Sequence, residues 1–149
     1  MKYAIVRAHV EHVPDLIPLF DAYRMFYRQH SDFSGAQQFL KDRLSNNESV
    51  VFIAFADENA IGFVQLFPVF SSVTMEPMYI LNDLYVEENY RGKGIGKMLI
   101  DQAKDLCREK KLKGLVLQTE ADNPAQQMYE HLQFKQDTDL HYFWLNTDR

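Results

Sequence analysis

Residues 91–97 read Arg91-Gly92-Lys93-Gly94-Ile95-Gly96-Lys97 and are the stretch that decides the fold. A strand-like apolar run, 79–86, precedes them, and residues 98–111 follow with the apolar spacing of a helix. Glycines at every second position permit backbone conformations that a Cβ penalises. A helix N-terminus offers free N–H groups and the positive end of its dipole. Together these features predict a phosphate-binding loop.

Two common glycine loops do not fit this spacing. A dinucleotide fingerprint requires G-x-G-x-x-G, but Lys97 stands three residues after Gly94. A P-loop requires G-x-x-x-x-G-K-[ST], but Met98 follows Lys97 and Arg91 stands five residues before Gly96. The residues match R-x-x-G-x-G instead. This pattern resembles the coenzyme A pyrophosphate loop of the GNAT N-acetyltransferase superfamily.

A second segment, residues 122–134, supports the same resemblance. It is similar to the GNAT block N-x-x-A-x-x-x-Y-E-x-x-G-F, which it matches at Ala125, Tyr129, Glu130 and Phe134. Two positions depart from the block: Asp122 stands where the family often has Asn, with Asn123 next to it, and Gln133 replaces the usual Gly. Because the two motifs occur together over residues 81–134, the chain is identified as a member of this superfamily. The N-terminal half resembles it only in the order of its elements.

Length, charge and composition restrict the class of protein to which the chain can belong. The length of 149 residues predicts a single domain, residues 1–149. A net charge of −5 argues against a nucleic-acid partner. The longest apolar run, Val50 to Ala56, is too short to span a bilayer, and no signal peptide is recognisable. The single cysteine, Cys107, excludes an internal disulfide and fits a cytoplasmic protein. It lies on the apolar face of its helix, which favours a buried small side chain over a nucleophile.

The order of the predicted elements is that of an α/β protein. Four helices are predicted, at 13–29, 34–46, 97–111 and 125–132. Strands are predicted at 3–8, 50–56, 61–70, 79–86, 115–119, 134–135 and 141–145, the second and third forming a hairpin around 57–59. Pro68 indicates that the third strand bends or loses a partner near its end. We expect a mixed, mostly antiparallel sheet of about seven strands, the GNAT fold that the resemblance implies.

The resemblance also implies the reaction. A GNAT enzyme transfers the acetyl group of acetyl-CoA, its co-substrate, to a primary amine in a ternary complex, and here the acceptor would be a small molecule such as a polyamine or an amino acid. The carbonyl oxygen needs a fixed N–H donor, which the resemblance places on the strand at Leu84, Tyr85 and Val86. The residues implied in coenzyme binding are these three together with Arg91, Gly92, Lys93, Gly94, Ile95, Gly96, Lys97, Asn123 and Ala125. No H-x-x-x-H or Cys/His pairing suggests a metal site, so none is predicted.

Two positions are candidates for proton transfer. Tyr129 matches the family tyrosine that protonates the sulfur of coenzyme A; by helical position alone it would be an ordinary half-buried tyrosine. Asn82 stands where some polyamine-acetylating relatives have a glutamate base, but an amide cannot take the proton, so Asn82 would orient a water. Asp83, Glu120 and Glu76 are nearby carboxylates, and Asp83 and Glu120 are also candidate substrate residues. Strand alternation would put Asn82 and Asp83 on opposite faces of the sheet. A solvated or salt-bridged role for these carboxylates remains open.

The acceptor site is less determined. Tyr23, Arg24 and Tyr27 either form a wall of the acceptor pocket, where the arginine could hold a carboxylate, or cover the sheet and face solvent. Two other functions remain open: a catalytically weak acyl-CoA sensor, favoured by Asn82, and an interaction protein without coenzyme affinity. The aromatic C-terminal segment could support a homodimer, as is common in the family.

Overall fold

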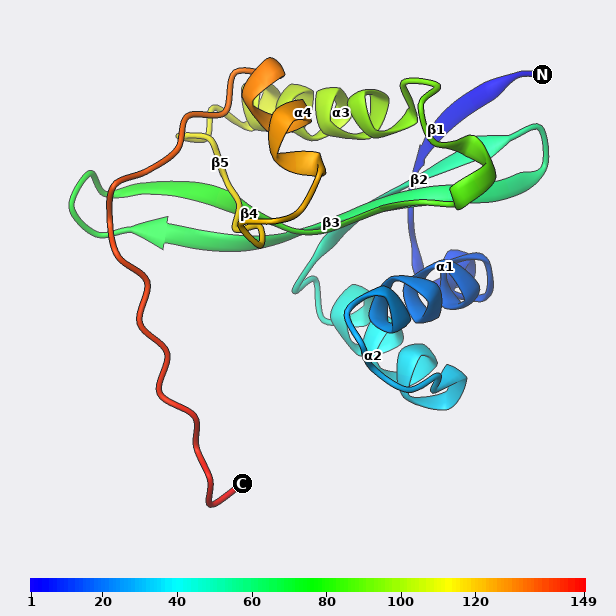
Figure 1. Cartoon of the computed structure of the whole chain (residues 1–149), viewed down its shortest axis with the longest axis horizontal. Coiled ribbons are helices and arrows are strands. Elements are labelled where there is room, and N and C mark those ends of the chain that lie inside the picture. Colours follow the sequence, from blue (N-terminus) through cyan, green and yellow to red (C-terminus); the bar gives the residue numbers. More distant parts are fainter. The chain divides into compact units, whose positions relative to one another are not determined.

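The computed structural model describes all residues from Met1 to Arg149, which form two compact units, Met1–Gln118 and Thr119–Arg149. The first unit contains a five-stranded mixed sheet in the order β1-β2-β3-β4-β5 (Figure 1). Pairing is antiparallel from β1 to β4, and β5 joins β4 in parallel. The strands are β1 (Tyr3–Arg7), β2 (Val50–Ala56), β3 (Asn59–Ser71), β4 (Glu76–Val86) and β5 (Leu115–Val116). The α/β class and mixed sheet are those predicted.

The first unit has three α-helices and two 3-10 turns. These are η1 (Val10–His12), α1 (Val13–Phe26), α2 (Phe33–Ser45), η2 (Glu88–Tyr90) and α3 (Ile95–Lys110). Pro14 falls in the first turn of α1, where the missing N–H costs nothing. Pro18 lies inside α1, which nevertheless continues to Phe26. Asp32 caps α2 by accepting a hydrogen bond from Gly35 N at 2.9 Å.

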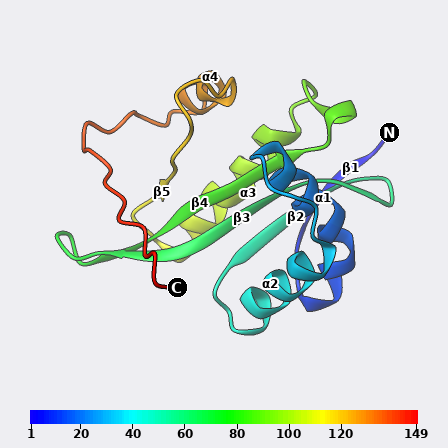
Figure 2. The same cartoon turned by 60° about the horizontal axis from the view of Figure 1, so that its bottom comes forward.

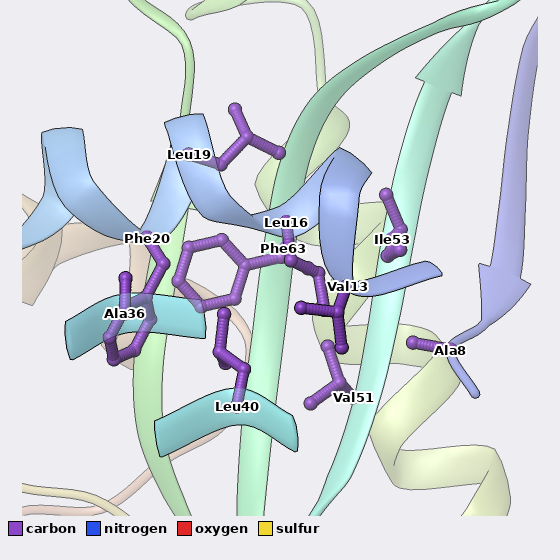
Figure 3. Packing of buried hydrophobic residues seen from close by; sticks show 10 residues of the cluster. All are labelled: Ala8, Val13, Leu16, Leu19, Phe20, Ala36, Leu40, Val51, Ile53 and Phe63. Atoms are coloured by element: carbon purple, nitrogen blue, oxygen red, sulfur yellow. The ribbon is translucent and has the colours of Figure 1, made fainter. Parts of the chain in front are cut away.

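α1 and α2 cover one face of the sheet. Leu16 from α1 and Leu40 from α2 are completely buried against Phe63 of β3 (Figure 3). Each such side chain contributes about 1.5–3 kcal/mol by leaving water. α3 covers the opposite face, and Gly62 of β3 lies against it: a Cβ there would come within 3.5 Å of Leu99 and 2.9 Å of Tyr85 O. Because both faces are covered, β2 is almost continuously apolar.

The β3–β4 hairpin continues beyond β2 (Figure 2). β2 pairs with β3 only as far as Leu66, and β3 then continues with β4 alone to Ser71. Pro68 lies in this part, where β3 has no neighbour on its β2 side. The predicted loss of a strand partner near Pro68 is therefore confirmed, and the missing proline N–H removes no ladder bond from β2.

The second unit contains one helix, α4 (Ala125–His131), and no strand. The predicted strands at 134–135 and 141–145 are wrong, and β5 is shorter than the predicted 115–119. Segment 141–145 has the aromatic composition of a strand. That preference reflects packing on a neighbouring strand, and residues 141–145 do not form a strand here. Five strands, not about seven, make up the sheet.

Candidate active site

The outer edge of β4 is unpaired along its second half. β4 pairs with β5 only through Tyr79 and Ile80, whereas its pairing with β3 continues to Val86. From Leu81 to Val86, β4 therefore has a strand neighbour on one side only. The backbone groups on the other side lack a strand partner, which suits an extended ligand as at any exposed sheet edge; Val86 O is the exception, because it accepts a hydrogen bond from Arg91 Nε.

A β-bulge interrupts β4 at Asn82. Gln65 of β3 pairs with Asp83, and the next residue, Leu66, pairs with Leu81, so Asn82 has no partner across the ladder. The interruption lies two residues before the segment 84–86, on which the family resemblance placed the N–H donor. The hydroxyl of Tyr23, on α1, donates to the backbone oxygen of Asn82 at 3.3 Å. The bulge thus presents one residue outside the regular ladder, a feature common beside active sites.

The carboxyl group of Asp83 is buried directly behind the bulge. Asp83 is only 5% exposed. Gln65 Nε2 donates to Asp83 Oδ2 at 2.6 Å, and Asn82 Nδ2 donates to Asp83 Oδ1 at 3.0 Å. Burial raises the pKa of Asp83, while hydrogen bonds from Gln65, Asn82 and Tyr23 act in the opposite direction. The expectation that Asn82 and Asp83 point to opposite faces is wrong, because the bulge breaks the alternation between them.

Gln65 was not among the residues that the sequence suggested. It is 1% exposed, and its Oε1 has no hydrogen-bond partner. A signal was available, since Gln65 is the only side chain with hydrogen-bonding groups between Ile61 and Phe70. A buried amide in such a strand requires a polar partner, and that partner is Asp83.

The glycine loop has the backbone conformation that its composition predicts. Gly92 and Gly94 have φ angles of +75° and +82°. No atom lies within 4 Å of the position of a Cβ at either residue, so the requirement is conformational and not steric. Gly96 does not have a positive φ angle. The reason is that α3 begins at Ile95, two residues before the predicted start, so Gly96 lies in the first turn of the helix.

The start of α3 leaves several N–H groups without helical acceptors. Gly94 is the N-cap, and Met98 N donates to Gly94 O at 3.0 Å. The N–H groups of Ile95, Gly96 and Lys97 precede this bond and have no carbonyl inside the helix. They follow the unpaired edge of β4 through a short connection, 87–94. An anion bound here would meet the positive end of the α3 dipole.

The basic residues of the loop differ in their contacts. Arg91 Nε donates to Val86 O at 2.8 Å, and its guanidinium carbon lies 5.4 Å from the ring centre of Tyr85. Arg91 therefore ties the loop to the end of β4. Lys97 Nζ lies 2.6 Å from Asp101 Oδ2, in an exposed pair one helical turn apart. Such a pair is weak in water.

The aromatic wall of α1 lies over the same part of the sheet. The Tyr23 ring makes edge contacts with Phe63 and Tyr85, with centroids 5.9 and 6.4 Å apart, and packs on Tyr27 at 5.1 Å. Tyr23 therefore covers the sheet and also reaches the bulge at Asn82. Of the predicted acceptor residues, the structure brings Tyr23 and Asp83 together with Asn82.

Arg24 has partners in the connection between α1 and α2. Its NH1 donates to His30 O at 2.9 Å and lies 4.0 Å from Asp21 Oδ1. Asp21, which the sequence did not single out, is 3% exposed and accepts from Asp32 N and Ser31 Oγ, both at 2.7 Å. The bond from Asp32 N is the main cause that lowers the pKa of Asp21. These contacts hold the connection in place.

The second unit carries the remaining predicted residues. Tyr129 lies on α4 and is half-buried; its ring packs edge-on against Phe134, with centroids 6.0 Å apart. Asn123 Oδ1 accepts from Ala125 N at 2.9 Å and so shapes the start of α4. Glu120 is exposed, and its carbonyl accepts from Asn123 N at 2.9 Å.

Three further features of the chain are its single cysteine, its acidic and histidine side chains as metal ligands, and the length of its helices. Cys107 is 6% exposed on the inner face of α3, and burial raises the pKa of its thiol. This confirms the prediction of a buried side chain, since a reactive cysteine requires a lowered pKa. No group of three or more His, Cys, Asp and Glu side chains is placed to hold a metal ion. No helix has both the length and the apolar character needed to cross a bilayer.

Known proteins resemble this chain over most of its length. The model of the acetyltransferase (GNAT) family matches residues 16–134. An uncharacterized N-acetyltransferase, YhfO, of Bacillus subtilis is 48% identical over 132 residues, which cover 88% of this chain and 89% of the relative. A streptothricin acetyltransferase of Escherichia coli is 28% identical over 62% of this chain and 51% of its own. The crystal structure of a probable acetyltransferase matches with a TM-score of 0.88 and 38% identity, covering 96% of this chain and 97% of the other. The chain thus belongs to the GNAT acetyltransferase family, and it is an acyltransferase with the fold of that family.

Proposed function

We propose that this acetyltransferase transfers the acetyl group of acetyl-CoA to a primary amine of a small molecule, by direct attack while both substrates are bound. One observation carries the proposal: the unpaired half of β4, with its bulge at Asn82, leads directly into the glycine loop and the N-terminus of α3. A strand edge suited to an extended arm is thereby joined to a site suited to a pyrophosphate.

The donor would be held mainly by backbone groups. The N–H groups of residues 92–97 would bind the pyrophosphate, because two glycines in the left-handed region and a helix N-terminus expose them. Leu84, Tyr85 and Val86 would align the pantetheine arm, and one of their N–H groups would stabilise the charge that develops on the carbonyl oxygen. Asn123 and Ala125 are further candidate coenzyme-binding residues, because they lie in the segment that resembles the family block. Acetyl-CoA supplies the activated thioester.

Tyr129 would supply the proton that the departing thiolate requires. Its hydroxyl ends a half-buried side chain whose ring is fixed by Phe134, and a fixed ring reduces the cost of placing a general acid. The match of residues 122–134 to the family block supports this role.

The acceptor amine must lose a proton before it attacks, since a free alkylamine is mostly protonated at neutral pH. Asn82 cannot accept that proton but can orient a water that does. Tyr23 and Tyr27 would form one wall of the acceptor site, with Arg24 as a polar group. Glu120 is a further candidate substrate residue on the basis of its place in the sequence. The name of the Escherichia coli relative supports a small-molecule acceptor, because streptothricin is the compound that it names.

We further propose a cytoplasmic location, in keeping with a single buried thiol.

A homodimer is also proposed, because Tyr142, Phe143 and Trp144 are each more than three-quarters exposed. Sedimentation of the purified chain at micromolar concentration tests it; a purely monomeric species would contradict the dimer.

The test of function is release of coenzyme A thiol from acetyl-CoA with a panel of amines. The panel holds polyamines, amino acids, aminoglycosides, streptothricin and peptides. Turnover with a small-molecule amine supports the proposal, and turnover confined to peptides contradicts it. Calorimetry with coenzyme A is the parallel measurement: binding without release from any amine would indicate an acyl-CoA sensor instead.

A further inference from the structure

The bulge of β4 holds two buried polar residues, Asp83 and Gln65, to which the proposed reaction assigns no role. Asp83 and Gln65 are 5% and 1% exposed, and Asp83 accepts hydrogen bonds from both Gln65 and Asn82. Buried polar groups without a structural necessity are costly. A carboxyl group enclosed by two sheet strands and α1 therefore calls for a functional reason.

The two atoms of the Asn82 carboxamide have different surroundings. Nδ2 donates to Asp83 Oδ1 at 3.0 Å, so the amide nitrogen faces the buried carboxylate. The amide oxygen is consequently turned away from Asp83, and the residue itself is exposed. As an acceptor of hydrogen bonds, this oxygen suits the N–H of an amine or the O–H of a water.

The backbone of Asn82 is held as well. The Tyr23 hydroxyl donates to Asn82 O at 3.3 Å, and the bulge frees Asn82 from the ladder with β3. The free rotation that remains is that of the carboxamide, which can turn its nitrogen or its oxygen outwards. An anionic Asp83 accepts hydrogen bonds only, so it selects the orientation with the oxygen outwards.

We propose that Asp83 is a positioning residue, whose carboxylate holds the Asn82 carboxamide with its oxygen towards the acceptor amine or its activating water. This inference rests on the proposed function. Asp83 acts through Asn82 and contacts no substrate itself. The groups that face the Asp83 carboxyl are Gln65 from β3, Asn82 from β4 and the titratable Tyr23 hydroxyl from α1.

Steady-state kinetics with the best amine of the panel test this role. Asp83→Ala is expected to lower kcat about tenfold, the effect of a lost hydrogen bond to a charged group. Asp83→Asn is expected to stay within about threefold of wild type, because its amide oxygen can still accept from Asn82 Nδ2. Asp105→Ala, which removes an exposed carboxylate of α3, is the matched control and should change nothing. Calorimetry with coenzyme A should give the same affinity for all variants, which shows that the donor site is intact.

A double-mutant cycle distinguishes positioning from direct action. Asn82→Ala should lower kcat about as much as Asp83→Ala, and the double variant should be no slower than Asn82→Ala alone. Three results would overturn the proposal. The first is a fold-decrease in kcat of the double variant that equals the product of the fold-decreases of the two single variants. The others are an Asp83→Asn variant as slow as Asp83→Ala and an Asn82→Ala variant as fast as wild type.

A second readout does not depend on turnover. In the ¹⁵N-labelled protein, the side-chain NH₂ signals of Asn82, assigned by their loss in Asn82→Ala, should shift and exchange faster with water in Asp83→Ala. Unchanged signals would overturn the positioning role even if every amine of the panel is acetylated. If no amine is acetylated, the proposed function fails, and these signals still decide whether Asp83 orients Asn82.

Discussion

Asn82 Nδ2 lies 3.0 Å from Asp83 Oδ1, although neighbours in a strand normally point to opposite faces. The β-bulge opposite Gln65 and Leu66 makes this contact possible. It joins an exposed amide to a buried carboxyl group at the strand edge where we propose that the acetyl donor binds. A local irregularity of the sheet thus brings together groups that a regular strand would separate.

Asp83→Asn is expected to stabilise the protein at neutral pH. Burial raises the folded-state pKa of Asp83, so its favourable contribution is complete below the unfolded pKa, about 3.9, and is lost as pH rises through the folded pKa. Asparagine does not ionise, so the variant does not lose stability as the pH rises. Thermal unfolding between about pH 4 and pH 7 should show its advantage over wild type growing with pH; a difference that is constant with pH would contradict the assignment.

Asp21→Asn is expected to have the opposite pH dependence. The hydrogen bond from Asp32 N, followed by those from Ser31 and the charge of Arg24, lowers the folded-state pKa of Asp21. Its stabilisation is present above the unfolded pKa and is lost as pH falls through the folded pKa. Asp21→Asn should therefore unfold at a lower temperature than wild type at pH 7, with a deficit that shrinks below about pH 4. A deficit that persists in acid would show that the carboxylate charge is not the cause.

Gly94→Ala is expected to destabilise the protein by about 1–2 kcal/mol, the cost of a left-handed conformation for a residue with a Cβ. No atom crowds the position, so the cost arises from φ alone. Gly94→Asn is the matched control, since asparagine tolerates this region better. Chemical denaturation should rank wild type, Asn and Ala in falling stability. Equal stabilities would show that the loop adopts another conformation in solution.

Tyr129→Phe is expected to lower kcat while leaving the affinity for coenzyme A nearly unchanged. The variant removes the hydroxyl and keeps the ring that packs against Phe134. A general acid typically contributes about 10²–10⁴-fold. Single-turnover kinetics with calorimetry separate the two effects. Full activity would exclude Tyr129 as the acid, and a loss of affinity alone would assign it to binding.

Local patterns explain what the sequence predicted correctly. The conformations of Gly92 and Gly94, the helical stripe around Cys107 and the hairpin at 57–59 depend on neighbouring residues and on side-chain periodicity. The loss of a partner near Pro68 follows from one missing N–H. The strand predicted at 141–145 was wrong, because composition describes only a local preference. A strand also needs a neighbouring strand to supply its hydrogen bonds.

The sequence by itself therefore determined the class of fold, the conformation of the glycine loop and the family, because short motifs with fixed spacing carry them. Only the tertiary structure decided that Gln65, Asn82 and Asp83 form one cluster, and that Tyr23 reaches it from α1. These contacts depend on the register between β3 and β4 and on the packing of a helix more than fifty residues away in the chain. A shift of one residue in that register turns side chains to the other face, and no local pattern in the sequence specifies it.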